Sequence, residues 1–353
     1  MNLEQIIKNI EPPDNVAMEK ARKHWLDVAK PLLSLGRLED IIVQIAGIKG
    51  NAVFELNKKA LVIMCADNGV VAEGVTQSTQ NITATVTENF ATGKTCASIM
   101  SEIAHTDVFP VDIGVAVDVA GVTDKALKVA YGTNNMVKGS AMTEEMTLKA
   151  IEVGINKVLE LKQKGYSIIA TGEMGIGNTT TSCAVAAVLT GERVDTITGR
   201  GAGLSSEGVK RKIKAIEKAI SLNKPDKNNI IDVVSKVGGL DIAGLIGIFI
   251  GGAIYKVPIV IDGLISSVAA LCAVRLSPLI REYMLASHLS KEPVSALILR
   301  ELNLYPIVCA EMCVGEGTGA LTLFPLIDMS LGVYTKLHTF QNWNGDEVYR
   351  LLK

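Results

Sequence analysis

The segment from Thr171 to Thr181, Thr-Gly-Glu-Met-Gly-Ile-Gly-Asn-Thr-Thr-Thr, is suited to holding an anion such as a phosphate. It follows a strand-like run and opens a helix-like run, so its glycines would let backbone amides converge at a helix N-terminus. Its threonine hydroxyls add donors and a helix cap. The spacing matches neither the Walker A motif nor the dinucleotide fingerprint. The predicted ligand-binding residues of this loop are Gly175, Gly177, Asn178 and Thr179.

A second glycine turn, Gly199-Arg-Gly-Ala-Gly-Leu204, precedes a helix-like segment with one apolar stripe. Gly201 and Gly203 are its predicted ligand-binding residues. At about 100° per residue, Lys212 lies roughly 70° from the centre of the stripe and Lys210 roughly 90°. Lys212 is therefore slightly better placed to reach into a cleft. The geometry does not separate the two lysines clearly, and on this geometry alone a lysine lying along a helix edge is the better interpretation.

A third turn, Val314-Gly-Glu-Gly-Thr-Gly-Ala320, places Glu316 between two glycines. Because Gly315 and Gly317 have no side chains to cover the glutamate, a ligand could approach it closely. Both glycines are therefore predicted to contact phosphate or ribose. A glutamate in a turn is also often simply solvated, and the turn alone leaves both interpretations open.

Four short apolar runs must position these turns, and each is followed by an acidic residue. The runs cover residues 60–65, 108–111, 167–171 and 257–261, and the acids are Asp67, Asp112, Glu173 and Asp262. Continuous apolar strands separated by long helical stretches indicate a parallel sheet buried on both faces, with ligands at the carboxyl ends of the strands. Each acid alone serves equally well as a helix cap, but four together favour one shared site.

The predicted fold is therefore α/β, a parallel sheet flanked by helices. Helical periodicity over residues 3–10 and 16–33, broken by Pro12 and Pro13, and a polar tail after Gly332 indicate a smaller helical domain. We predict that residues 1–45 and 331–353 form this small domain. Residues 46–330 would form the large α/β domain.

Composition excludes several classes of protein. The chain has 35 Lys and Arg against 37 Asp and Glu, a net charge of −2, which argues against binding nucleic acid through bulk positive charge. The most apolar stretch, Ile242–Tyr255, is shorter than the roughly 20 residues of a membrane helix. Without a secretory signal pattern, we expect a cytoplasmic protein that contacts no membrane. Six scattered cysteines and only four histidines predict buried free thiols rather than disulfides or a metal site.

Six motifs, taken in order, closely resemble the nicotinate-nucleotide:dimethylbenzimidazole phosphoribosyltransferases of cobamide synthesis. They are Ser34-Leu-Gly-Arg-Leu-Glu39, Cys65-Ala-Asp-Asn-Gly-Val70, Gly172-Glu-Met-Gly-Ile-Gly-Asn-Thr-Thr180, Ser235-Lys-Val-Gly-Gly-Leu-Asp241, Ile261-Asp-Gly263 and Gly315-Glu-Gly-Thr-Gly-Ala320. The resemblance extends from about residue 12 to residue 330. Any one motif would be weak, whereas six in order are specific.

The resemblance implies transfer of a 5-phosphoribosyl group from nicotinate mononucleotide to an aromatic lower-ligand base, giving an α-nucleotide and free nicotinate. It assigns the general base to Glu316, a supporting glutamate to Glu173 and the helix lysine to Lys212, which decides between the two lysines. It further implies a Rossmann-like sheet, a dimer with itself or with a paralogue, and no metal or redox cofactor. The remaining acidic candidates are Asp67, Asp241 and Asp262.

The predicted pocket for the acceptor base departs from the family pattern. Its residues are Ser78, Thr79, Val86 and Val314. Family members often have Pro at Thr79 and a glutamine at Val86, with His at Asn68 and Arg at Cys313. Replacing a hydrogen-bonding glutamine by valine would cost discrimination for a base with a second ring nitrogen. We therefore hypothesise an acceptor other than dimethylbenzimidazole, such as phenol or p-cresol.

A second class of function stays open, a weakly catalytic or non-catalytic subunit that binds nucleotide and stabilises a paralogous partner. Retention of Glu173, Lys212 and Glu316 argues against it. A subunit without activity would have no reason to keep a glutamate between two glycines.

Overall fold

A single parallel sheet organises the part of the chain that the structure, a computed structural model, describes, residues 3–122 and 127–342. Its strand order is β2-β1-β3-β4-β5, and every neighbouring pair is parallel. The strands are β1 (Lys59–Ala66), β2 (Thr106–Gly114), β3 (Ile168–Met174), β4 (Ile259–Ile261) and β5 (Met284–Ala286). The predicted α/β fold is confirmed, and β5 is a strand that the sequence analysis missed.

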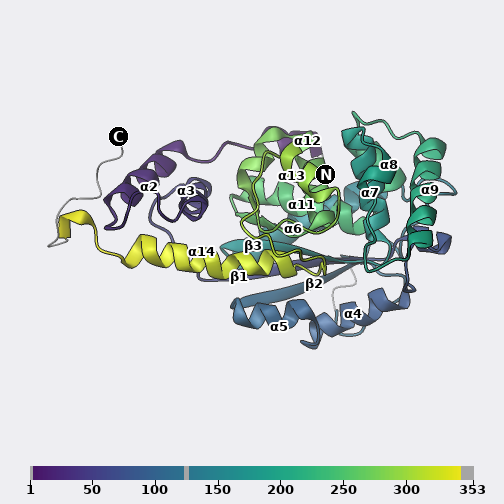
Figure 1. The fold of residues 1–353 in the computed structure, drawn as a ribbon, viewed down its shortest axis with the longest axis horizontal. Helices are drawn as coiled ribbons and strands as arrows, with labels where there is room; N and C mark the ends of the chain where they lie inside the picture. The colour runs from purple at the N-terminus through teal and green to yellow at the C-terminus, as the bar shows by residue number, and fades with distance from the viewer. Residues whose placement is uncertain (1–2, 123–126, 343–353) are drawn as a thin grey trace.

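Helices cover both faces of this sheet (Figure 1). On one face lie α6 (Glu144–Gln163), α11 (Leu240–Tyr255) and α12 (Leu264–Leu276), and on the other lie α4 (Asn81–Ala91), α5 (Cys96–Ile103) and α14 (Thr318–Lys336). Strand β1 alternates between the two cores, with Val62 and Met64 in one and Leu61 and Ile63 in the other. Burial on both faces explains why the strands are continuously apolar.

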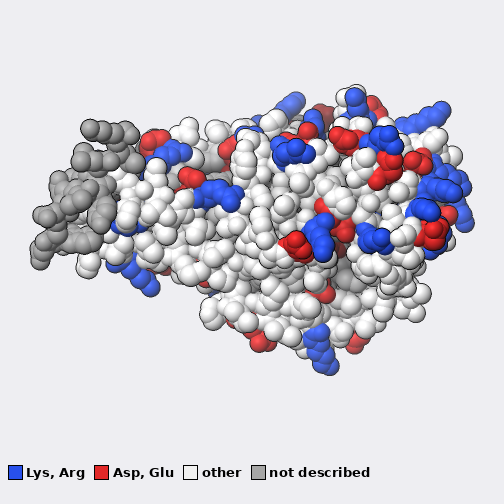
Figure 2. Space-filling view, viewed as in Figure 1, with Lys and Arg blue, Asp and Glu red and all other residues white. Residues whose placement is uncertain are grey.

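Four further helices extend the sheet domain at one end. Helices α7 (Asn178–Thr190), α8 (Val194–Ile197), α9 (Ser206–Asn223) and α10 (Ile230–Val237) pack together at one end of the molecule, at the right of Figure 1. The other short elements are α13 (Ser295–Glu301) and the 3-10 turns η1 (Gly69–Glu73), η3 (Pro278–Tyr283) and η4 (Phe340–Asn342). Figure 2 shows charges of both signs interspersed on this face, with lysines and arginines gathered over α9.

Helices from the N-terminal and C-terminal parts of the chain pack together at the opposite side of the molecule, at the left of Figure 1. Helix α2 (Asn15–Asp27) packs on α3 (Arg37–Lys49), and α3 packs on α14 (Figure 1). Trp25 makes an edge contact with Tyr334, with ring centroids 4.9 Å apart. Helix α1 (Leu3–Lys8) instead contacts α11 and contributes Leu3 to the core of the sheet domain. The division into domains at residues 45 and 331 stays a prediction, and its last part, residues 343–353, lies outside the described residues.

The strand order opens a crevice at the carboxyl ends of β1 and β3. The chain leaves β1 for an outer position on one side and later returns to its other side, so the connections diverge at this point. Ligands of doubly wound sheets bind where such connections diverge. None of the helices in the described part of the chain combines the length and apolarity that a bilayer span needs.

Candidate active site

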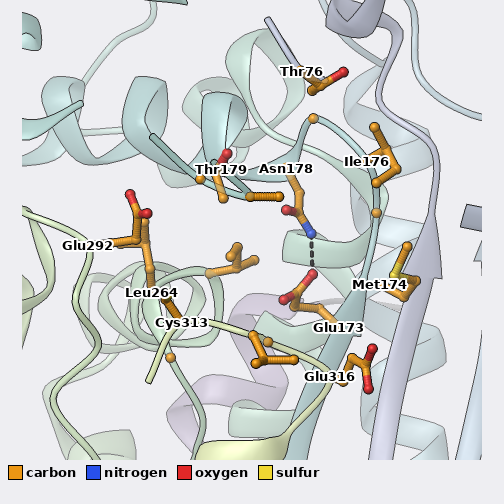
Figure 3. A pocket seen from close by; sticks show the side chains of 18 of the residues that line it. Thr76, Glu173, Met174, Ile176, Asn178, Thr179, Leu264, Glu292, Cys313 and Glu316 are labelled. Atoms are coloured by element: carbon orange, nitrogen blue, oxygen red, sulfur yellow. Dashed lines mark hydrogen bonds between the residues drawn. The ribbon is translucent and has the colours of Figure 1, made fainter. Parts of the chain in front are cut away.

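A pocket of about 310 Å³ opens at this carboxyl edge, a size within the range of small-molecule sites. Loops after β1, β3, β4 and β5 line it, together with the turn before α14. In Figure 3, Glu173 and Asn178 face each other at the centre, with Glu316 on one side and Glu292 on the other. The predicted site residues that line the pocket are Ser78, Val86, Glu173, Gly175, Gly177, Asn178, Thr179, Gly201, Asp262, Val314, Gly315 and Glu316.

Other predicted site residues are not part of this lining. They are Asp67, Thr79, Gly203, Lys212, Asp241 and Gly317. The Gly203 carbonyl accepts a hydrogen bond from the side-chain amide of Gln77, and Asp67 Oδ2 accepts one from the Ala116 amide at 2.8 Å. Of the four strand-end acids, only Glu173 and Asp262 line the pocket; Asp112 forms an ion pair with Lys128 at 3.0 Å. The roles of all these residues stay predictions.

The loop after β3 brings the N-terminus of α7 to the pocket. Gly177, with φ of 96°, caps the helix in a left-handed conformation that glycine adopts without strain. A side chain at Gly175 would overlap the carbonyl oxygen of Ala66. These glycines bring the start of α7, with Gly177, Asn178 and Thr179, into the lining of the pocket, and the positive end of a helix stabilises an anion.

Lys212 supplies a positive charge beneath this loop. Its side chain is only 1% exposed, and Nζ lies 2.8 Å from Thr179 Oγ1 and 3.4 Å from the Gly199 carbonyl oxygen. Lys210, its rival in the helix geometry, instead forms an exposed ion pair with Glu207. The buried ammonium therefore links the two glycine turns that were predicted to hold a phosphate.

Glu173 belongs to a buried group of acids. The side-chain amide of Asn178 donates to Glu173 Oε2 and to Asp241 Oδ2, and the second distance is 3.1 Å. Burial and the nearby Asp241 raise the pKa of Glu173 to about 8, and burial raises the pKa of Asp241 to about 6. These surroundings favour the protonated, neutral form of Glu173.

Glu316 is held differently, in a half-buried turn of unusual backbone. Gly315, Glu316 and Gly317 all have left-handed φ values, of 84°, 62° and 89°. Asp262 fixes this turn, because its carboxylate accepts from the Gly317 amide at 3.1 Å and the Gly319 amide at 2.8 Å. The Glu316 Oε2 atom accepts from the Ala97 amide at 3.2 Å. Burial and Asp262 raise the pKa of Glu316, and the Ala97 amide opposes that shift.

Comparisons with known proteins identify the family of the chain. The family model described as "Phosphoribosyltransferase" matches residues 10–344. A nicotinate-nucleotide-dimethylbenzimidazole phosphoribosyltransferase of Clostridium acetobutylicum is 49% identical over 344 residues, covering 97% of each chain. The chain belongs to this phosphoribosyltransferase family.

Further members give the same result. An enzyme of the same name from Acetivibrio thermocellus is 48% identical, and the alignment covers 96% of each chain. The crystal structure of CobT from Thermus thermophilus has a TM-score of 0.86 at 33% identity, and covers 92% of this chain and 98% of its own. The predicted resemblance to the phosphoribosyltransferase family is thus confirmed over almost the whole chain.

Several residues that line the pocket of this family member escaped the sequence analysis. They are Arg200, His288, Ser290, Glu292, Met174 and Ile176. In Figure 3, Glu292 lies on one side of Glu173, and Met174 and Ile176 lie on the other. His288, Ser290 and Glu292 follow β5, so a strand at residues 284–286 would have pointed to them. Strand β5 is as short as β4 but has no β-branched residue, so no strand pattern marks it in the sequence.

The cysteine prediction was half right. All six cysteines are free, and Cys65, Cys183 and Cys272 are buried as expected. Cys96, Cys309 and Cys313 are exposed, because they lie in surface turns or at the open start of α5. Among residues 3–122 and 127–342, no three His, Cys, Asp or Glu side chains gather as metal ligands would.

Proposed function

We propose that the chain transfers the 5-phosphoribosyl group of nicotinate mononucleotide to an aromatic lower-ligand base, releasing nicotinate and an α-nucleotide for cobamide synthesis. One observation carries the proposal: two carboxylates, Glu173 and Glu316, line the same pocket as a phosphate-type helix start. Membership of the phosphoribosyltransferase family supports it, as do the names of the relatives. The catalytic interpretation is thereby favoured over that of an inactive subunit.

The 5′-phosphate would bind at the N-terminus of α7. Gly177, Asn178 and Thr179 line the pocket at this helix end, and Lys212 adds a buried positive charge next to Thr179. Gly201, whose added side chain would contact Thr179, keeps the second glycine turn close enough to contribute. Holding the phosphate fixes the anomeric carbon of the ribose for in-line displacement with inversion.

The chemistry needs one proton acceptor. Nicotinate leaves as a neutral ring nitrogen when the bond from the anomeric carbon to the pyridinium nitrogen breaks, so it requires no proton. The acceptor base forms the new bond from nitrogen or oxygen and loses its proton, and Glu316 would take that proton. Glu173 would lie beside the ribose, where the positive charge of the reacting sugar favours its ionised form and is stabilised by it.

The acceptor would bind on the side of Glu316. Ile82, Val86, Met174, Ile176 and Val314 give the pocket apolar lining, and Figure 3 shows Met174 and Ile176 on the same side as Glu316. Valine at position 86 offers no hydrogen bond to a second ring nitrogen, which supports a phenolic acceptor, phenol or p-cresol, over dimethylbenzimidazole. The hydroxyl of a phenol still presents a proton to Glu316.

The test is turnover with single acceptors. The purified chain is incubated with nicotinate mononucleotide and, separately, dimethylbenzimidazole, adenine, phenol or p-cresol, and both nicotinate release and the new nucleotide are measured by chromatography. We expect product with at least one aromatic acceptor and the highest kcat/KM with a phenol. No product with any acceptor, from the chain alone or with a paralogue added, would reject the enzymatic proposal, whereas preference for dimethylbenzimidazole would reject only the phenolic one.

We further propose that the chain works in the cytoplasm as a dimer, either with itself or with a paralogue. The family resemblance supports this assembly. Light scattering after size-exclusion chromatography distinguishes the cases, because a homodimer has twice the 37.5 kDa mass of one chain. A monomer that becomes active only after addition of a paralogue would indicate the heterodimer.

A further inference from the structure

Helix α5 begins next to Glu316 of the pocket, although none of the helix residues lines the pocket. Its N-cap is Thr95, whose hydroxyl accepts from the Ser98 amide at 3.0 Å. The Ala97 amide, which has no partner within the helix, donates to Glu316 Oε2 at 3.2 Å. A carboxylate thus occupies the positive end of this helix.

The surroundings of Glu316 make this contact important. Its turn lies near Asp262, and Glu173 is a second acid in the same pocket. No Lys, Arg or His forms an ion pair with Glu316 among the residues that the structure describes. The nearby charged groups are acids, which disfavour ionisation of Glu316. The start of α5 is the group that favours its ionised form.

We propose that the first turn of α5, through the Ala97 amide, holds Glu316 as an ionised and oriented base. One carboxylate oxygen is fixed by the amide, which leaves the other to receive a proton from the acceptor. Ala97 is a positioning residue, because it acts through Glu316 and does not line the pocket. This inference rests on the proposed function.

The connection between β1 and β2 gives the contact a further role. It carries α4, whose Ile82 and Val86 line the acceptor side of the pocket, and then α5, whose amide holds the base. Helix α5 also packs on α14, which begins directly after the Glu316 turn. One excursion of the chain therefore shapes the acceptor wall and orients the base that serves it.

Two changes remove the Ala97 N–H. Ala97→Pro does so at the second residue of the helix, where no helical hydrogen bond is lost, although Cys96 must stay helical before a proline. Replacing the Ala97 amide by an ester, with lactic acid in place of alanine, removes the N–H without adding a ring. Cys96→Pro is the matched control, because Thr95 is already extended and proline suits the first helical position.

The measurement is kcat/KM as a function of pH for the full chain, with nicotinate mononucleotide and its best acceptor. Loss of the Ala97 N–H should move the acid limb upward by about one pH unit, so that activity below the limb falls about tenfold while activity above it is kept. Cys96→Pro should keep the limb of the unmodified chain. If the proline variant does not fold, the ester variant gives the result.

An unchanged acid limb in the ester variant, or a uniform loss at every pH, would overturn the inference while leaving the proposed function intact. Absence of turnover in the unmodified chain would instead overturn the proposed function. Circular dichroism and thermal unfolding of each variant establish that the limb is compared between folded proteins.

Discussion

Two turns of the same sequence type begin two helices at this pocket, Gly175-Ile-Gly177 before α7 and Gly315-Glu-Gly317 before α14. In both, the second glycine is left-handed and caps the helix. They differ in the residues before it. Gly315 and Glu316 are left-handed as well, whereas Gly175 and Ile176 are not.

The difference places two glutamates in opposite settings. Glu173, at the end of β3 before the first turn, is buried and shares the Asn178 amide with Asp241. Glu316, inside the second turn, is half-buried and accepts a hydrogen bond from the Ala97 amide at the start of α5. Burial raises the pKa of both glutamates; the neighbouring Asp241 adds to that shift for Glu173, whereas the Ala97 amide opposes it for Glu316.

Of the variants that test this contrast between the two glutamates, Glu316→Gln should have the largest effect on turnover. Glutamine keeps the shape of the side chain but cannot accept a proton, so kcat should fall about 100- to 10,000-fold. The dissociation constant of nicotinate mononucleotide, measured by calorimetry, should change little, because Glu316 acts on the acceptor. Turnover within tenfold of the unmodified chain would remove Glu316 as the base.

Much of this comparison could be predicted from the sequence. The acids at the carboxyl ends of β1, β2, β3 and β4 follow apolar runs that are recognisable as strands in the sequence. The glycine turns stand out by composition alone. The parallel sheet and its carboxyl edge follow from the same pattern. The choice of Lys212 over Lys210 needed the family resemblance, and the structure gives its physical reason in the contact with Thr179.

Other parts depend on contacts between distant segments. Strand β5 has three residues, none of them β-branched, so neither it nor the following His288 and Glu292 showed a pattern. The hydrogen bond between Ala97 and Glu316 joins residues 219 positions apart. Asp262 follows β4 yet caps α14, which no local capping rule would indicate.

The two capping glycines should differ in tolerance to a side chain. In Gly317→Ala the new Cβ would overlap Leu61 Cδ1, a buried core atom, whereas in Gly177→Ala it would lie 2.9 Å from Val71 Cγ2 at a half-buried position. Both variants bear the cost of left-handed backbone, about 1–2 kcal/mol. We expect Gly317→Ala to lose about 1–3 kcal/mol more through overpacking.

Urea unfolding of the two variants, followed by circular dichroism, measures that difference. Equal losses of unfolding free energy would show that the turn before α14 adjusts as easily as the turn before α7. A folded Gly317→Ala variant should also lose more turnover, because the glycine carries the Glu316 turn.

Glu173→Gln should affect turnover less than Glu316→Gln. Glutamine resembles the protonated glutamic acid that burial favours, and its oxygen can still accept from Asn178. The loss is then that of the ionised form near the ribose, which we expect to be about tenfold in kcat, equivalent to one hydrogen bond of about 1.5 kcal/mol. A loss as large as that of Glu316→Gln would mean that the two glutamates act as one unit, and the double variant would then lose no more.

The same variant should change the dependence of stability on pH, by the smallest of these effects. The pKa of Glu173 is about 8 in the folded chain against an ordinary value of 4.5, so between these values the folded chain keeps a proton that the unfolded chain has lost. Stability therefore falls as pH rises through this window and becomes level above about pH 8. Asp241 adds a similar fall between 3.8 and about 6.

Glu173→Gln removes the larger window and leaves that of Asp241. Between pH 6 and pH 8 the urea midpoint of the unmodified chain should decline more steeply than that of the variant, which makes the variant the more stable protein at pH 8. Glu316→Gln is the matched control, because the α5 amide opposes the shift of Glu316 and a smaller change of slope is expected. Parallel midpoints for the unmodified chain and Glu173→Gln would show that Glu173 is ionised in the folded protein at neutral pH, and the contrast between the two glutamates would then lie in their hydrogen bonds alone.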